Sequence, residues 1–266
     1  GFIIDLGGKK ERYDAVVLAT GGASYTSTGS TGDGYAFAKA FGHSVTPIVP
    51  SLISLETEEE WPKELMGLSL KNVTLNAYNK KKKLVYSELG EMLFTHFGVS
   101  GPLVLSASSR IADDPAGARL TIDLKPGLDA DELDRRLVRD FQQNSRKSFQ
   151  NALDGLFPRR MIPVMVQLSG IAADTETNSV TREQRHAFAA LIKCVPITVK
   201  AAMPIDQAII TRGGINVKEI DPSTMESKLV SGLYFAGEVI DVDAYTGGFN
   251  IQIACSTGVL AGRSII

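Results

Sequence analysis

The chain has 266 residues, of which 44% are hydrophobic and 7% aromatic, and it carries a formal net charge of -2. This length and composition support one large core or two smaller ones, and they exclude a disordered low-complexity chain. The weak net charge gives no overall basic field for nucleic acid, and no apolar run approaches the roughly 18 residues of a membrane span, so we expect neither partner. The two cysteines, Cys194 and Cys255, indicate a reducing, cytoplasmic compartment, and we expect both to be buried thiols.

The first predicted elements are a strand over "GFIIDL", a turn over "GGKKER" and an apolar strand from Ala15 to Ala19. The apolar strand has no polar alternation, which is typical of a strand buried on both faces in an α/β sheet. A loop rich in Gly, Ser and Thr follows and leads into a short helix near residues 34–41. Small residues let backbone N–H groups approach a ligand closely, so this loop is either a ligand cradle or a long surface turn.

The pattern changes near Ser51, where alternating apolar and polar residues predict antiparallel strands. The lysine run from Lys80 to Lys83 lies between two of them and is predicted to be a solvated hairpin turn rather than a phosphate or membrane site. Another strand is predicted over "CVPITVKAAM". Apolar spacing predicts helices over residues 102–111, 129–141, 159–168 and 181–193. This segment lacks the βαβ rhythm of the two ends, which indicates an insert in a parent α/β domain.

After Pro204, the run "GLYFAGEV" predicts a buried strand that ends in Gly237 and Glu238. The carboxyl end of a strand is the edge at which open parallel sheets bind ligands. Glu238, Asp241 and Asp243 follow one another closely, so their carboxylates can accept hydrogen bonds from a chain of sugar-like hydroxyl groups. A metal site is the competing interpretation, but the region has neither clustered histidines nor EF-hand spacing, and we expect no metal.

A helix is predicted to begin directly after Gly247 and Gly248. Its first turn, Phe249, Asn250 and Ile251, presents N–H groups that have no intrahelical partner. Such a helix terminus stabilises an anionic oxygen or a ring that acquires negative charge.

Three long motifs stand in order along essentially the whole chain: "ATGGASYTSTGSTGDGYAFAKAFGH", "GEMLFTHFGVSGP" and "GGINVKEIDPSTMESKLVSGLYFAGEVIDVDAYTGGFNIQIACSTGVLAG". They resemble the BaiN-like, aminoacetone-oxidase-type family of FAD-dependent oxidoreductases. The resemblance implies an α/β fold in which a two-dinucleotide-binding, Rossmann-like FAD domain is interrupted by an inserted domain of strands and helices. It implies a first FAD-binding part over residues 1–55, an insert or substrate cap over 56–202, and a C-terminal FAD-binding part over 203–266.

The resemblance also implies which residues bind FAD. A strand end crosses the cofactor, two carboxylates face its ribitol or pyrophosphate, and the helix start faces N1 and O2 of the flavin ring. These residues are Thr20, Gly21, Gly22, Gly237, Glu238, Asp241, Gly247, Gly248, Phe249, Asn250 and Ile251. The family opens with a strand and a G-x-G-x-x-G turn that this sequence lacks, and it has Gly at the position of Ala244. We therefore expect an N-terminally truncated chain with an incomplete FAD site.

The function that follows is hydride transfer between a small-molecule substrate or NAD(P)H and flavin, as part of an FAD-dependent oxidoreductase. One alternative is a non-enzymatic fragment that does not retain FAD, and another is a flavoprotein that acts on RNA. The catalytic residues are unknown. His96 is a candidate proton donor or a structural histidine, and Arg212 is a candidate contact to flavin or an acidic substrate, or a surface ion pair. The oligomeric state leaves no readable motif.

Overall fold

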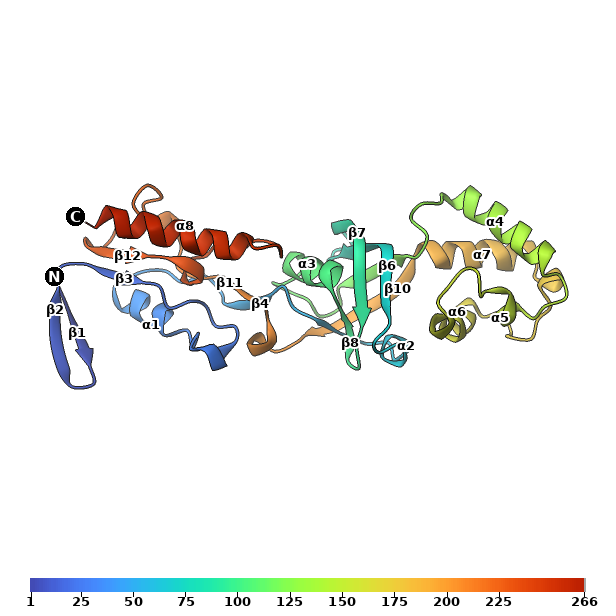
Figure 1. Ribbon diagram of the computed structural model, residues 1–266, viewed down its shortest axis with the longest axis horizontal. Coiled ribbons are helices and arrows are strands. Elements are labelled where there is room, and N and C mark those ends of the chain that lie inside the picture. Colours follow the sequence, from blue (N-terminus) through green and yellow to red (C-terminus); the bar gives the residue numbers. More distant parts are fainter. Residues whose placement is uncertain (266) are drawn as a thin grey trace. The chain divides into compact units, whose positions relative to one another are not determined.

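The structure is a computed structural model that describes residues 1–265 and shows a mixed α/β fold with a six-stranded barrel and several helices (Figure 1). The chain forms two compact units. The split unit contains Gly1–Ile53 and the C-terminal segment from Ala202, and the barrel unit contains Ser54–Ala201. No helix within residues 1–265 combines the length and the apolar character needed to cross a bilayer.

The split unit brings the two ends of the sequence into one sheet. Strand β3 pairs in parallel with β12, with Leu18 opposite Phe235, while β11 pairs antiparallel with β4. Its strands are β1 (Phe2–Leu6), β2 (Lys9–Tyr13), β3 (Val16–Leu18), β4 (Val49–Ser51), β11 (Ile210–Arg212) and β12 (Leu233–Phe235), and its helices are α1 (Asp33–Ala40) and α8 (Phe249–Ser264). The parallel pair places the loop after β3 beside the loop after β12, which is the arrangement that open α/β sheets use for ligands.

The core of the split unit lies around β12, where Leu233 and Phe235 are fully buried. They belong to a cluster that draws side chains from β3, α1, the segment after β11, and α8: Leu18, Tyr35, Ala38, Ile215, Ile220, Met225, Leu233, Tyr234, Phe235, Val239, Ile240 and Ala261. Burying a large apolar side chain contributes about 1.5–3 kcal/mol, so this cluster fixes the position of the loops that follow β3 and β12.

Three expectations for this part of the chain were wrong. The apolar run is a strand only from Val16 to Leu18, and Val17 is 37% exposed, because β12 is its only neighbour in the sheet among residues 1–265. The N-terminal turn is limited to Gly7 and Gly8, and the residues after it form β2, which pairs with β1. The thiol of Cys255 lies on an outward face of α8 and is exposed.

The barrel unit closes six strands in the order β10, β5, β8, β7, β6, β9. Its strands are β5 (Leu55–Thr57), β6 (Ser69–Tyr78), β7 (Leu84–Phe94), β8 (Gly98–Ser100), β9 (Arg119–Asp123) and β10 (Val195–Ala202). Alternation fills the interior, since Leu75 lies opposite Ile122 and Ala77 lies opposite Leu120, and all four are fully buried. The lysine run forms the predicted turn between β6 and β7.

The helices of this unit follow the predicted starts closely. Asp129 and Thr181 close capping boxes at the starts of α4 and α7, each with a reciprocal bond to the residue three positions later. The helices are α2 (Trp61–Glu64), α3 (Pro102–Arg110), α4 (Ala130–Gln143), α5 (Phe149–Ala152), α6 (Ile162–Ser169) and α7 (Arg182–Lys193). The predicted helix over 159–168 is instead a 3-10 turn, Arg159–Met161, followed by α6. Cys194, predicted to be buried, is exposed directly after α7.

A buried hydrogen-bonded chain in the split unit resembles a catalytic triad in its geometry. His43 is 4% exposed, with Nε2 at 2.8 Å from Ser227 Oγ and Nδ1 at 3.1 Å from Glu219 Oε2. The Ser227 hydroxyl oxygen also accepts hydrogen bonds from the N–H groups of Leu229 and Val230, at 3.0 and 2.9 Å. Ser227 cannot act as a nucleophile, because it is buried and the lone pairs of its hydroxyl oxygen accept hydrogen bonds. The hydrogen bonds among His43, Glu219 and Ser227 are therefore structural.

We expect Glu219→Gln to make stability less dependent on pH. Hydrogen bonds from Ser44, and then from His43, hold the pKa of the Glu219 carboxyl below its usual range. A carboxyl with a lowered folded-state pKa stabilises the fold above its unfolded pKa, about 4.3, and this contribution is lost as pH falls through the lowered folded pKa. Urea unfolding of wild type and variant should therefore differ at neutral pH and converge in acid.

The matched control for this prediction is Asp14→Asn. Asp14 is exposed, and its side chain has no hydrogen-bond or ion-pair partner within residues 1–265. Its replacement removes one carboxylate charge without removing a hydrogen bond, so it controls for the loss of charge alone. An equal change in pH dependence for both variants would show that Glu219 has no special role.

Candidate functional site

The loop after β3 is tied to β11 by a short set of hydrogen bonds. The N–H groups of Ala23 and Ser24 donate to Thr211 Oγ1 at 2.7 and 3.0 Å. Glu238 Oε1 accepts from Ser24 Oγ at 3.3 Å and from Thr211 N–H at 2.5 Å. Gly22 leaves room for this contact, because a Cβ there would lie 2.4 Å from Thr211 Oγ1. The Glu238 carboxylate therefore joins three segments that the sequence places far apart.

A second carboxylate and a tyrosine lie near Glu238. The Tyr35 hydroxyl is buried and has no hydrogen-bond partner within residues 1–265. Burial, followed by the charges of Glu238 and Asp241, raises the pKa of Tyr35 to about 12. The hydroxyl is therefore protonated at neutral pH and remains free to donate. The Asp241 carboxylate also has no hydrogen-bond or ion-pair partner in the described part of the chain, and it is partly exposed, so this acceptor is available to a ligand, whereas the Tyr35 hydroxyl is enclosed.

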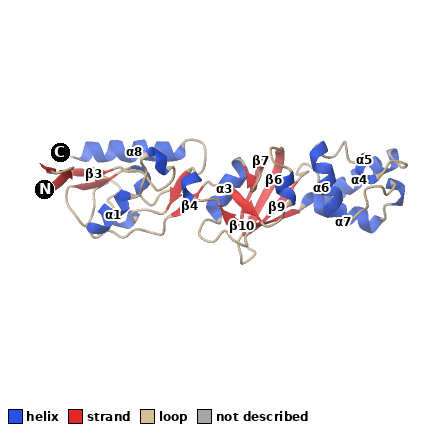
Figure 2. Ribbon diagram, turned by 90° about the horizontal axis from the view of Figure 1, so that it is seen from below, coloured by secondary structure: helices blue, strands red, loops and turns tan. Residues whose placement is uncertain are grey.

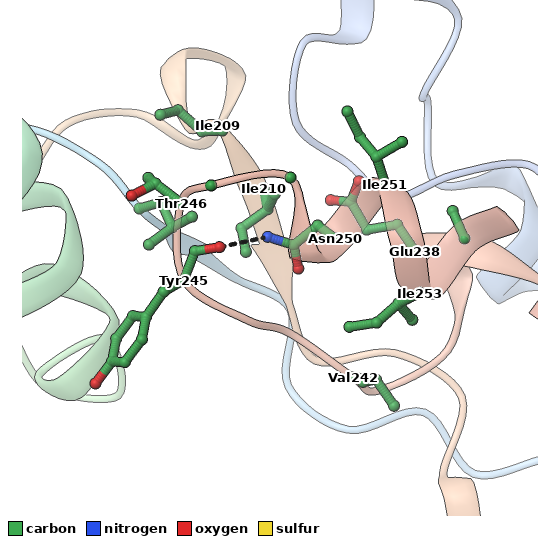
Figure 3. Close-up of a pocket in the computed structure, with 13 residues that line it drawn as sticks. Ile209, Ile210, Glu238, Val242, Tyr245, Thr246, Asn250, Ile251 and Ile253 are labelled. Carbon is green, nitrogen blue, oxygen red and sulfur yellow. Dashed lines mark hydrogen bonds between the residues drawn. The ribbon is translucent and has the colours of Figure 1, made fainter. Parts of the chain in front are cut away.

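The start of α8 forms one wall of a cavity of about 510 Å³ (Figure 3). Gly248 is the N-cap residue, with φ +91°, and no side chain of the described residues caps the helix. The N–H groups of Phe249, Asn250 and Ile251 donate to no protein oxygen in residues 1–265, as predicted from the sequence. The preceding loop is held by the Asn250 side chain, which donates to Ala244 O and accepts from Ala244 N–H, both at 2.9 Å. The helix terminus is thus fixed and open to the cavity.

The remaining walls of the cavity are mostly apolar, and the sequence did not predict them. They are formed by Leu52, Ile209, Ile210, Val242, Tyr245, Thr246, Ile253 and Ala254.

Leu52 is fully buried and has a φ of +52°, a left-handed conformation that is uncommon for a bulky residue. Strain of this kind gathers at functional sites, and a positive φ carries no sequence signal unless glycine occupies the position. Ala244 has no positive φ, so its difference from the family's glycine causes no strain.

The structure brings only some of the predicted residues to the cavity. Glu238, Gly247, Gly248, Asn250 and Ile251 line it. The other predicted residues belong to the same split unit but do not line the cavity as the structure describes it. They are Thr20, Gly21, Gly22, Gly237, Asp241 and Phe249. Arg212, which lies in β11 opposite Val49, is not among the described lining residues either. His96 belongs to the barrel unit, where it is exposed and packs edge-on against Phe97, with ring centroids 4.9 Å apart.

The donor set fits the flavin end of FAD. An uncapped helix start suits a ring oxygen with partial negative charge, apolar walls suit a planar ring, and the Asp241 carboxylate suits polyol hydroxyl groups. Among residues 1–265, no group of three or more His, Cys, Asp or Glu side chains is placed to hold a metal ion.

Comparisons with known proteins show the family to which the chain belongs. Residues 49–210 match the family described as "HI0933-like protein barrel and H2TH domain". The chain is 30% identical over 99% of its length to a 3-dehydro-bile acid delta(4,6)-reductase of Clostridium scindens, covering 65% of that protein. It is equally similar, at 30%, to the ribosomal RNA dihydrouridine synthases of Haemophilus influenzae and Escherichia coli, over 99% and 100% of this chain and 63% and 64% of theirs. The chain thus spans slightly less than two thirds of each relative.

Proposed function

This chain belongs to the HI0933-like, BaiN-like family of FAD-dependent oxidoreductases, and from that premise we propose that its split unit binds the flavin end of FAD and serves hydride transfer. The observation that carries the proposal is the open start of α8, which has no capping side chain and faces a cavity with apolar walls. A Rossmann-like identity for the split unit, and a substrate-covering role for the barrel unit, are parts of the same proposal.

Each group of residues has a separate task in the proposed site. The N–H groups of Phe249, Asn250 and Ile251 hold a ring oxygen and favour the form with more negative charge. Asp241 holds hydroxyl groups of the ribitol, and Glu238 keeps the loop of Gly21 and Gly22 in place. When bound, flavin supplies the hydride acceptor and donor.

The substrate class that we propose is a carbon–carbon double bond conjugated with a carbonyl group. A delta(4,6)-unsaturated 3-dehydro-bile acid contains such a system, and dihydrouridine differs from uridine by saturation of one. Each reduction adds one hydride and one proton across the double bond. The two named substrates differ greatly in size and share only the conjugated double bond. We therefore propose that this chain acts on such a bond, either in a small molecule or in RNA.

The hydride source, the cellular location and the roles of two further residues are predictions from the sequence that we include in the proposal. NAD(P)H is the proposed source of the hydride, and the cytoplasm is the proposed location. His96 and Arg212 are candidates for the proton donor and for an anion contact. The competing proposal is that this chain is not enzymatic and does not retain FAD, because the family's G-x-G-x-x-G turn is not in this sequence.

The test starts with FAD retention by the purified chain. We expect flavin absorbance to elute with the protein after gel filtration of the chain mixed with FAD, with the full-length Escherichia coli relative as the reference. The loaded chain, reduced with dithionite without oxygen, should be reoxidised by a 4-en-3-one steroid or by uridine in RNA, but not by the saturated form of either. Complete loss of flavin on the column would favour the non-enzymatic fragment.

A further inference from the structure

A second hollow, of about 490 Å³, lies on the barrel unit at the end of β6, β9 and β10 (strands labelled in Figure 2). Strand register explains how it forms. Arg119 on β9 lies directly opposite Tyr78 on β6 and, on its other side, opposite Thr198 on β10. These three side chains therefore form one row across three adjacent strands, and all three line the hollow. Thr121, two residues further along β9, adds a hydroxyl from the next row on the same face.

The rim of the hollow carries the lysine run that the sequence predicted to be only a solvated turn. Lys80 and Lys82 both line the hollow. Lys80 Nζ pairs with Asp114 Oδ1 at 2.5 Å, whereas Lys82 and Arg119 have no ion-pair partner within residues 1–265. The turn is ordered by hydrogen bonds from Lys82 N–H to Asn79 O at 2.8 Å and from Lys83 N–H to Asn79 Oδ1 at 3.0 Å. Two uncompensated cations are thus held around one polar depression.

We propose that this hollow binds a nucleoside phosphate, either as a free nucleotide or as one unit of an RNA strand. The Arg119 guanidinium offers a planar fork of donors that suits a phosphate, and the ammonium of Lys82 adds charge at the rim. The Tyr78 ring provides an aromatic face beside the phosphate contact, as single-stranded nucleic-acid sites do for a base. The volume is in the range of roughly 300–1,000 Å³ that small-ligand sites occupy.

The low charge of the whole chain does not contradict this site. Net charge averages over both units, whereas binding of a phosphate depends on the cations within about a Debye length, near 8–10 Å. The sequence shows the lysine run but not Arg119, which lies 37 residues after Lys82 and reaches the same place only through pairing of β6 with β9. The proposal requires no flavin, so it stands or falls separately from hydride transfer.

The test compares two pairs of substitutions that remove equal charge from the barrel unit. The first pair is Lys82→Gln with Arg119→Gln. The control pair is Arg135→Gln with Lys147→Gln, two exposed cations outside the hollow that form no ion pair in residues 1–265. Binding of a labelled uridine oligonucleotide to the 266-residue chain is followed by fluorescence anisotropy, with AMP, NADPH and inorganic phosphate as competitors.

We expect the first pair to weaken binding at least tenfold and to lower the salt slope by about one to two, with less than a threefold effect from the control pair. Arg119→Lys should fall between wild type and the first pair, because it keeps the charge and loses the fork. Competition by AMP or NADPH at similar affinity would assign the site to free nucleotides, and binding only by the oligonucleotide would assign it to RNA. Circular dichroism first checks that both pairs of variants are folded. The proposal would be overturned if the two pairs lost affinity equally or if wild type bound none of the probes. It would also be overturned if wild type bound anionic vesicles as tightly as the oligonucleotide.

Discussion

Ile251→Asp is expected to lower the affinity for FAD by at least tenfold without destabilising the fold. Ile251 is the third residue of α8, lines the cavity, and is 72% exposed, so its replacement disturbs no core contact. A carboxylate there occupies the position that we assign to a negatively charged ring oxygen. Two unit charges about 4 Å apart repel by about 4 kcal/mol at an effective dielectric of 20. A ring oxygen with a partial charge gives a fraction of this, and about 1.4 kcal/mol is enough for a tenfold loss. Fluorescence quenching during titration with FAD measures the affinity.

The stability of this variant moves in the opposite direction from its affinity. An aspartate in the first turn of a helix stabilises it by about 0.3–1 kcal/mol, because it complements the helix dipole. The matched control is Ile251→Asn, which has a similar size and polarity without the charge and should bind FAD within about threefold of wild type. If both variants bind FAD as wild type does, the start of α8 does not face the flavin ring. If both lose affinity equally, the side chain of Ile251 matters and the helix dipole does not.

Local signals in the sequence were enough to place much of the secondary structure. The capping boxes at Asp129 and Thr181 specify where α4 and α7 begin, since the cap and the residue three positions later satisfy each other's N–H groups. The glycine pair before α8 likewise marks its start, with Gly248 in a left-handed conformation as N-cap. Each of these signals depends only on neighbours within a few residues, which is why a single sequence reveals it.

The features that the sequence did not reveal depend on contacts between distant segments. Closure of the barrel requires β10 to pair with both β5 and β9, and no single segment specifies that arrangement. The contact of Glu238 with Thr211 and Ser24 was hidden for the same reason, so the sequence indicated Glu238 as a ligand contact and not as a link between loops. The sequence could not show that the Tyr35 hydroxyl lacks a hydrogen-bond partner within residues 1–265, because an apolar helix position gives no sign of what surrounds it. The prediction that Val17 is buried was wrong, because the hydropathy of a strand does not show how many strands lie beside it.

Gly213→Ala is expected to destabilise the split unit by about 3 kcal/mol and to weaken FAD binding with it. A Cβ at this position would lie 2.0 Å from Pro47 O and 2.8 Å from Pro47 C, in a backbone conformation with φ +90°. A left-handed non-glycine residue costs about 1–2 kcal/mol, and overpacking adds a further 1–3 kcal/mol. Gly213 follows β11 directly, so a shift there moves Thr211, the anchor of the loop after β3.

The comparison with Gly29→Ala separates the two causes of that cost. Gly29 has a φ of +100° and no atom within 4 Å of its added Cβ, so only the backbone term applies and the loss should be about 1 kcal/mol. Hydrogen exchange of peptides from β3 and β12 measures the split unit directly, while fluorescence of Trp61, which is buried in the barrel unit, reports on the other unit. Equal losses for the two variants would mean that Pro47 yields to the new methyl group. A much larger loss at Gly213 would show that the contact of β11 with the segment before β4 is rigid, and that this rigidity holds Thr211 and Glu238 in place for the cofactor.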